Sequence, residues 1–141
     1  MRTAATLLSA IGAVVLLAGC SSQSTSKEAD DYSGTQKDVV TVVDDLINNA
    51  AKKDGKEICT TVLANDLVNQ LKQGTKDCAD AVGDQIDDAS NWDLNVTKVT
   101  VSGDSAQVVT KSDFNGDEAV RTLTLAKQDN DWRITGIEGG S

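Results

Sequence analysis

The residues of this chain with the widest reactive chemistry are its three cysteines, Cys20, Cys59 and Cys78. A cysteine can act as a nucleophile, bind a metal, carry a lipid or form a disulfide. The chain contains no histidine, which removes the commonest general base and the commonest transition-metal ligand. The spacing of the cysteines also differs from the C-x-x-C pattern of redox pairs. The sequence therefore offers little support for a metal centre or a redox site.

Aspartates are the second group that could do chemistry. They occur close together at three places: Asp44-Asp45, Asp87-Asp88 and Asp129 with Asp131. A catalytic aspartate needs burial or a charged partner to adjust its pKa. The sequence pattern places these residues on polar helix faces or in turns. We therefore expect no catalytic residue, no metal and no cofactor.

Residues 1–19 have the layout of a secretory signal peptide, with a positive Arg2 and an uncharged apolar run over residues 4–17. The run is shorter than the roughly 20 apolar residues that span a bilayer. A short motif at its end resembles the lipobox of bacterial lipoproteins: Leu17, Ala18, Gly19 and Cys20. The resemblance implies cleavage before Cys20 and attachment of diacylglycerol to its sulfur. Such a lipid would anchor the mature chain on the extracytoplasmic face of the cell membrane.

Lipid on Cys20 leaves Cys59 and Cys78 as an even pair in an oxidising compartment. A disulfide between them would close a loop of about 20 residues and stabilise the fold by roughly 3 kcal/mol in the chain-entropy model. The alternatives are a reactive redox pair or half of a metal site, for which a histidine or a third free cysteine is lacking. We predict a structural disulfide.

Length and charge fit one acidic domain. The chain has 141 residues, of which 13 are basic and 22 acidic, giving a net charge of −9. An acidic chain without a basic cluster argues against nucleic-acid binding and against electrostatic docking on anionic lipid. Residues 20–34 are polar and rich in serine, as is typical of a flexible tether. We divide the chain into a removed signal peptide (1–19), a lipidated tether (20–34) and a single domain (35–139).

The first half of this domain has helical periodicity. Apolar residues over 39–51 repeat at helical intervals, with Thr35 as the expected N-cap and Gly55 as the expected left-handed C-cap. Residues 58–71 predict a second helical stretch, which a break at Asn65-Asp66 would divide in two.

A further short helix is expected to carry Cys78, and the period then becomes that of strands. Four strands are predicted, at residues 94–102, 105–112, 118–128 and 132–137. Turns are expected at Gly103-Asp104, Asn115-Gly116 and Asp129-Asn130. The alternation of apolar residues changes phase between Leu94 and Val101, which predicts a β-bulge that curves the sheet.

Helices followed by antiparallel strands indicate an α+β domain. The layout, which ends in the strand Trp132-Arg133-Ile134, resembles the cystatin-like cone of nuclear transport factor 2 and ketosteroid isomerase. Over residues 36–138 it is similar to small secreted actinobacterial proteins of that fold. These often carry one cysteine before the second helical stretch and one before the sheet, as Cys59 and Cys78 do here. The resemblance implies N-terminal helices packed in a curved antiparallel sheet of about four strands.

Enzymes of this fold work inside the cone with an aspartate base, often a tyrosine donor, or a histidine–aspartate pair. Here histidine is missing and Tyr32 lies in the predicted tether. We expect a non-enzymatic module that binds an envelope protein, or a second copy through the sheet face. The alternative is a cone that binds a small apolar ligand, or a cryptic enzyme of the ketosteroid-isomerase type. A filled cone would favour the first, whereas an open cavity of roughly 300 Å³ with converging polar groups would favour the second.

Overall fold

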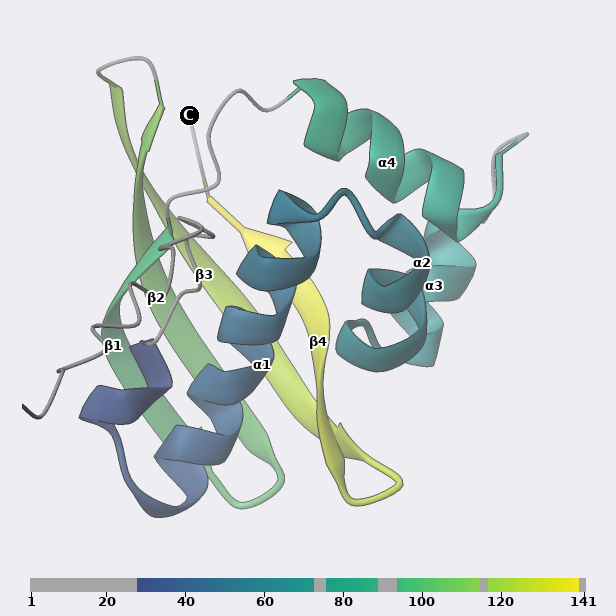
Figure 1. The fold of residues 1–141 in the computed structure, drawn as a ribbon. Coiled ribbons are helices and arrows are strands. Elements are labelled where there is room, and N and C mark those ends of the chain that lie inside the picture. The colour runs from purple at the N-terminus through teal and green to yellow at the C-terminus, as the bar shows by residue number, and fades with distance from the viewer. Residues whose placement is uncertain (1–27, 73–75, 89–93, 115–116, 140–141) are drawn as a thin grey trace, which may run out of the picture.

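The computed structural model describes residues 28–72, 76–88, 94–114 and 117–139 (Figure 1). The predicted signal peptide, the lipobox with Cys20, most of the tether and the Asn115-Gly116 turn lie outside these residues. The elements in chain order are η1 (Glu28–Asp31), α1 (Gly34–Ala51), α2 (Gly55–Glu57), η2 (Ile58–Val62), α3 (Asn65–Leu71), α4 (Cys78–Asp88), β1 (Leu94–Ser102), β2 (Ser105–Phe114), β3 (Asp117–Gln128) and β4 (Asp131–Glu138). Here η1 is a 3-10 turn and η2 a π-helical turn.

The four strands form one antiparallel sheet in the order β1-β2-β3-β4, as predicted. The turn residues explain the tight connections. Gly103 has φ +59°, and Asp129 and Asn130 have φ +53° and +70°, the left-handed pair that a two-residue hairpin needs. The chain thus turns back on itself at each described hairpin with little loss of pairing.

The sheet curves around the helices (Figure 1). The predicted bulge is confirmed, because the pairing of β1 with β2 shifts register between Val96 and Lys98. A second shift lies in the pairing of β3 with β4, between Thr124 and Leu125. Each irregularity adds a local bend and twist, so together they help shape the concave face that receives the helices.

Helix α1 crosses this concave face (Figure 1). Its burial follows from helical spacing, since one stripe of the helix faces the sheet: Val39, Val40, Val43, Leu46, Ile47 and Ala50. The helix begins at Gly34 with Ser33 in the N-cap position, so the predicted cap at Thr35 was wrong.

The C-terminal end of α1 also differs from prediction. Lys53 has φ +58°, its N–H donates to the carbonyl of Ala50 at 2.9 Å, and the N–H of Asp54 donates to that of Asn49 at 2.9 Å. These bonds form a Schellman-type ending with lysine in the left-handed position. Gly55 is buried at the contact of α2 with α4, where an added Cβ would lie 2.6 Å from the carbonyl oxygen of Ala79. This glycine is required by close packing and not by its backbone angle.

The folded domain begins earlier than residue 35. The main-chain N–H groups of Glu28 and Ala29 donate to the two carboxylate oxygens of Asp44 at 3.2 and 2.9 Å. The carboxylate of Glu28 accepts from the N–H of Val96 at 3.1 Å. Residues 28–31 therefore pack onto α1 and β1, although they were assigned to the tether. Asp44 was predicted to lie on a polar helix face, but it is buried. Its carboxylate accepts the hydrogen bonds of these N–H groups, as a buried polar group requires.

The core lies between α1, the short helices and the concave face of the sheet. Its largest fully buried side chains include Ile58, Leu123, Leu125, Ile134, Val39, Val43, Val62 and Val108. Trp132, only 6% exposed, closes one end. Within the described ranges, no helix has the length and apolarity needed to cross a membrane.

Candidate functional site

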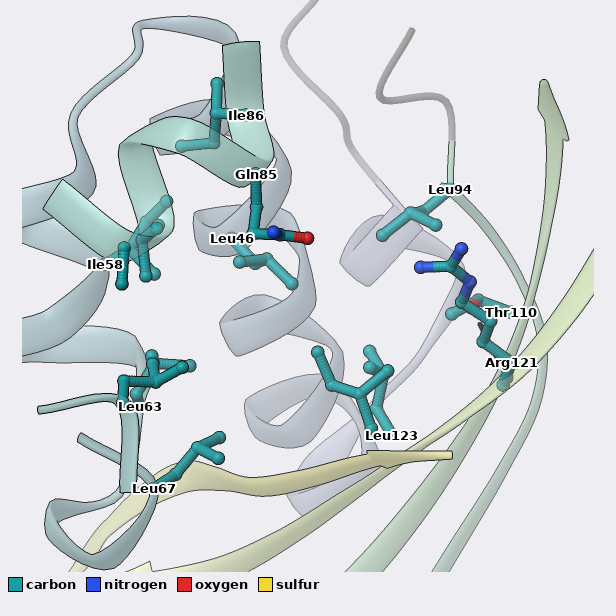
Figure 2. Close-up of a pocket in the computed structure, with 14 residues that line it drawn as sticks. Leu46, Ile58, Leu63, Leu67, Gln85, Ile86, Leu94, Thr110, Arg121 and Leu123 are labelled. Atoms are coloured by element: carbon teal, nitrogen blue, oxygen red, sulfur yellow. Dashed lines mark hydrogen bonds between the residues drawn. The ribbon is translucent and has the colours of Figure 1, made fainter. Parts of the chain in front are cut away.

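A cavity of about 300 Å³ lies between the short helices and the sheet (Figure 2). Its lining is drawn from α1, η2, α3, α4 and the four strands, so no segment builds it alone. Most of the lining is aliphatic: Leu46, Ile58, Leu63, Leu67, Leu71, Ala81, Val82, Ile86, Leu94, Leu123 and Ile137. Among the described residues, three polar side chains complete it: Gln85, Thr110 and Arg121. The arrangement is an apolar chamber with a small polar region.

Local periodicity explains how the helices supply this lining. Leu67 and Leu71 are four residues apart on α3, and Val82 and Ile86 are four apart on α4, so each pair shares one helix face. Gln85 precedes Ile86 and extends from α4 toward the sheet (Figure 2). The amphipathic character of these short helices thus places their apolar stripes on the cavity.

Strand alternation places the polar residues of the sheet. Thr110 follows Val108 by two residues on β2 and is 1% exposed. Arg121 precedes Leu123 by two residues on β3 and is directly opposite Thr110 in the register. The Thr110 hydroxyl donates to the main-chain carbonyl of Arg121 at 3.4 Å. The guanidinium of Arg121 remains exposed at the cavity, and it forms no ion pair with any residue in the described ranges.

A disulfide joins two walls of the cavity. Cys59 of η2 and Cys78 of α4, the pair proposed from the sequence, are bonded with their Cα atoms 6.2 Å apart. Cys78 is buried and Cys59 is half-buried. The bond holds α4, which carries Val82 and Ile86, against the π-helical turn that carries Ile58. Its role in this structure is that of a brace.

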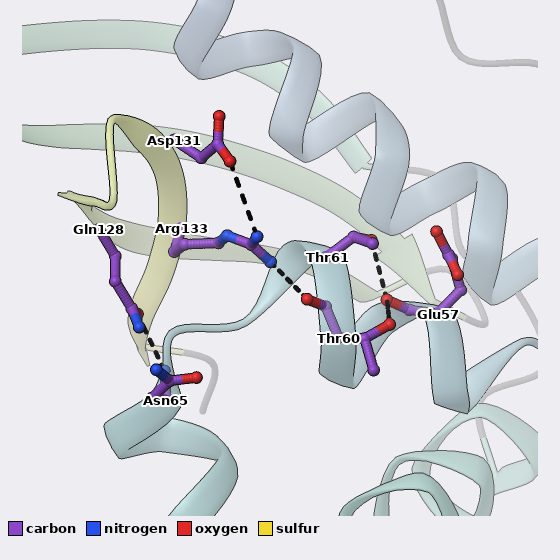
Figure 3. A network of polar contacts seen from close by, with 7 residues as sticks. All are labelled: Glu57, Thr60, Thr61, Asn65, Gln128, Asp131 and Arg133. Carbon is purple, nitrogen blue, oxygen red and sulfur yellow. Dashed lines mark hydrogen bonds and ion pairs between the residues drawn. The ribbon is translucent and has the colours of Figure 1, made fainter.

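A polar network fixes the same π-helical turn to the sheet (Figure 3). The Arg133 guanidinium donates to the carbonyl of Thr60 at 2.7 Å and lies 3.9 Å from the Asp131 carboxylate. The side-chain oxygen of Gln128 accepts from the N–H of Asn65 at 3.1 Å. The Arg133–Thr60 and Gln128–Asn65 contacts each link residues more than sixty positions apart, so they position the helical wall relative to the β3–β4 hairpin.

The segment between η2 and α3 extends this attachment. The N–H of Ala64 donates to the carbonyl of Ile134 at 2.8 Å, and Leu63 forms an isolated parallel bridge with the same residue. Leu63 and Ala64 are extended, which explains why the helical periodicity over 58–71 is interrupted just before Asn65. The expected division into two helices is confirmed, but the break lies at Leu63 and Ala64 and not at Asn65-Asp66, which begin α3. The break adds one short pairing to the free edge of β4.

A second, more open hollow lies between α1 and the β3–β4 hairpin, with a volume of about 520 Å³. Its lining is largely charged, and it includes Asp45, Lys127 and Arg133. The pKa of the Asp45 carboxyl is raised from its ordinary value, chiefly by partial burial and then by the neighbouring Asp44 and Glu57 carboxylates. Lys127 lies over the Trp132 ring at 5.5 Å, which shields one side of that core residue. This hollow lacks the apolar, enclosing walls of the first cavity.

Of the aspartates considered from the sequence, Asp45 and Asp131 line the open, polar hollow, and none of the six lines the apolar cavity. Asp44 holds η1, Asp87 pairs with Lys53 at 2.7 Å, and Asp131 flanks Arg133. In the part of the chain that the structure describes, no three histidine, cysteine or acidic side chains are grouped as metal ligands. Cys20 and residues 17–19 lie outside that part.

Sequence reasoning missed the polar residues of the cavity. Thr110 and Arg121 share the strand phase of the buried residues Val108 and Leu123, which was a detectable signal. A polar residue in phase with buried neighbours faces the interior of the cone.

Comparison with known proteins bears on the fold alone. No protein-family model and no curated protein sequence matches the chain. Among solved structures, it is similar to an NTF-2 like protein of unknown function from Shewanella oneidensis MR-1, with 16% identity and a TM-score of 0.55 over 77% of this chain and all of the other. It is also similar to a protein named Rd1NTF2_05 with five substitutions, at 10% identity and a TM-score of 0.54 over 76% of this chain and all of the other. Together with the helices packed in a curved four-stranded antiparallel sheet, these likenesses establish that the chain has the α+β cone fold of nuclear transport factor 2-like proteins.

Proposed function

We propose that the protein is a non-enzymatic, lipid-anchored binding module whose cone holds a small, predominantly apolar ligand outside the cell membrane. The cavity of about 300 Å³ carries this proposal. From the residues alone, a filled cone with a protein partner is the first expectation and a small apolar ligand is the alternative. A chamber of this size, at the lower end of the range of ligand sites, with three polar groups in an aliphatic lining favours that alternative.

The chemistry of the walls supports an apolar ligand. Leucine, isoleucine, valine and alanine side chains form most of the surface, and an apolar molecule placed there would leave water without forfeiting hydrogen bonds. The polar groups of Gln85 and Thr110 could orient one end of it. A strongly polar ligand would lose far more hydrogen bonds to water than these two side chains could replace.

The walls are also fixed before any ligand enters. The Cys59–Cys78 disulfide braces α4, and the Arg133 contact to Thr60 braces η2. A preformed chamber spends little of the binding free energy on ordering protein side chains. Such a preformed chamber favours measurable binding affinity even for a small ligand.

The proposed location rests on the lipobox resemblance at Leu17, Ala18, Gly19 and Cys20. A diacylglycerol on Cys20 supplies two acyl chains, which is enough for stable anchoring. The polar residues between Cys20 and Glu28 would then separate the cone from the membrane surface. The anchored cone could sample ligands in the envelope without leaving it.

The cavity can be tested with decanol, an uncharged probe with an apolar chain. We would use the mature chain from residue 20 onward with Cys20→Ser, so that no attached lipid competes for the cavity. Calorimetry and amide chemical shifts should report binding with changes around Leu123. Ala81→Phe, which places a ring in the cavity, should weaken binding at least tenfold.

The matched control is Ala51→Phe, which adds the same ring at the exposed end of α1. It should bind decanol as the parent chain does. Both variants must give the same circular dichroism spectrum as the parent chain, which shows that they fold. Absence of decanol binding to the parent, or equal binding by the Ala81→Phe variant, would contradict the proposed site.

The anchor is tested separately, in cells of a bacterium with lipoprotein-processing enzymes. Cys20→Ala should leave an unprocessed precursor that incorporates no labelled fatty acid, whereas the neighbouring Ser21→Ala should be processed and labelled. Efficient lipid labelling of the Cys20→Ala chain would refute the assignment.

A further inference from the structure

We infer that Arg121 recognises an anionic head group, so that the preferred ligand of the cone is a short amphiphile with one negatively charged end. This inference rests on the proposed function and adds to it the chemical class of the ligand. It starts from the charge of the cavity lining. The chain has 22 acidic residues, yet among the residues that the structure describes the lining contains no aspartate or glutamate, and Arg121 is its one charged residue.

The side chains near Arg121 leave its guanidinium available. Across the described ranges, six cations form ion pairs with carboxylates: Lys37, Lys53, Lys76, Lys111, Lys127 and Arg133. Arg121 is not among them, although it belongs to an acidic protein. A guanidinium without a carboxylate partner has five N–H donors in a planar fork, which matches a carboxylate or a phosphate.

The neighbouring residues fit this role. Thr110 lies opposite Arg121 in the register, and its hydroxyl makes a long bond of 3.4 Å to the Arg121 carbonyl. Figure 2 shows Thr110 and Arg121 together on the sheet side, with Gln85 extending from the opposite helical side. A head group at Arg121 could therefore also accept from the Thr110 hydroxyl or the Gln85 amide. The aliphatic side chains from η2, α3 and α4 would surround its tail.

The exposure of the Arg121 side chain limits how much its ion pair with a ligand can add to the affinity. Its side chain remains in contact with water, so the ion pair with a ligand would be screened and worth less than a buried pair. A bidentate, charge-assisted contact at such a position should favour the anion over an uncharged ligand of equal length by about tenfold. Arg121→Lys keeps the charge but loses the fork, so it should retain part of this preference.

The test compares four probes of the same chain length: decanol, decanoate, decyl phosphate and decylammonium. The protein is again the mature chain with Cys20→Ser, at probe concentrations below micelle formation. Decanoate or decyl phosphate should bind about tenfold more tightly than decanol, and decylammonium more weakly. Whichever anion binds better identifies the head group as carboxylate or phosphate.

Arg121→Gln should reduce the ratio of the anion's affinity to the affinity for decanol to near unity. Lys98→Gln, which removes one exposed cation from β1, is the matched control and should keep the preference. Equal binding of decanol and both anions by the parent chain would overturn this inference but leave the apolar cavity intact. Failure of all four probes to bind would overturn the proposed function itself.

Discussion

The main-chain N–H of Ala29 donates a hydrogen bond to Oδ2 of Asp44 at 2.9 Å, although 15 residues separate them. The other oxygen of the same carboxylate accepts from Glu28, whose own carboxylate accepts from Val96 on β1. One short segment is thus tied both to the long helix and to the bulged strand. Since the proposed tether leads into Glu28, these bonds are where the membrane anchor would connect to the cone.

Asp44→Ala should destabilise the domain, because it removes both acceptors and leaves buried N–H groups without partners. We expect the free energy of unfolding to fall by about 1 to 3 kcal/mol. Urea denaturation measures this loss, and faster amide exchange at residues 28 and 29 would locate it. Asp38→Ala, at an exposed position on the same helix, is the control and should change stability little. Equal stabilities of the two variants would show that the Asp44 contacts contribute nothing.

Asp45 should make stability depend on pH in the opposite sense to most carboxylates. Its pKa is raised by partial burial first and by Asp44 and Glu57 next, and lowered to a lesser degree by Lys52. The folded state therefore holds this proton more tightly than the unfolded state does. Its contribution to stability is full below the ordinary pKa of 3.8 and is lost as pH rises through the higher folded pKa.

Asp45→Asn removes this titration. The variant should become more stable relative to the parent as pH increases from about 3 to about 7. Denaturant unfolding of both chains across this range checks the sign. A difference that stays constant, or that shrinks with increasing pH, would contradict the raised pKa.

Trp132→Ala should strongly destabilise the domain. The indole is 6% exposed and packs within the core cluster, so its removal leaves a large cavity. We expect a loss of about 3 to 5 kcal/mol, seen as a lower melting temperature by circular dichroism. Trp132→Phe keeps most of the volume and should cost clearly less. A melting temperature unaffected by the alanine substitution would place this residue outside the stabilising core.

Removal of the disulfide tests both stability and the cavity wall. The Cys59→Ala and Cys78→Ala double variant should lose about 3 kcal/mol, because the closed loop spans 19 positions. Its α4 would be held less firmly, so decanol should bind more weakly. Reducing agent should lower the stability of the parent chain and leave the double variant unchanged. Two free thiols in the unreduced parent, found by mass spectrometry, would refute the bond.

Local patterns in the sequence were sufficient to predict the four strands and the main helices. Residues that are neighbours along the chain determine three kinds of feature: the four strands, the turns at Gly103 and at Asp129-Asn130, and the bulge after Val96. These features can therefore be predicted without knowledge of the fold. The pairing of Cys59 with Cys78 followed from the lipobox resemblance, which assigns Cys20 to lipid and leaves these two cysteines as a pair. The α+β class followed from the order of these elements, and the cone was what their resemblance to nuclear transport factor 2 implied.

Positions governed by distant contacts could not be read in this way. Gly55 suggested a helix end, yet Lys53 takes the left-handed angle and Gly55 is needed for the close approach of Ala79. Asp44 suggested a solvated face, yet it lies beneath the η1 turn. In both cases the deciding neighbour is far along the chain, so the local pattern contains no trace of it.

The sequence by itself thus determined the elements, their order and the acidic character of the chain, because these depend on composition and short-range periodicity. Only the tertiary structure decided that the cone stays partly open and that Arg121 is the single charged residue among the described residues of its lining. A cavity is the volume left when helices and a curved sheet fail to fill the space between them. That volume depends on the relative placement of every wall, which no single segment of the sequence specifies.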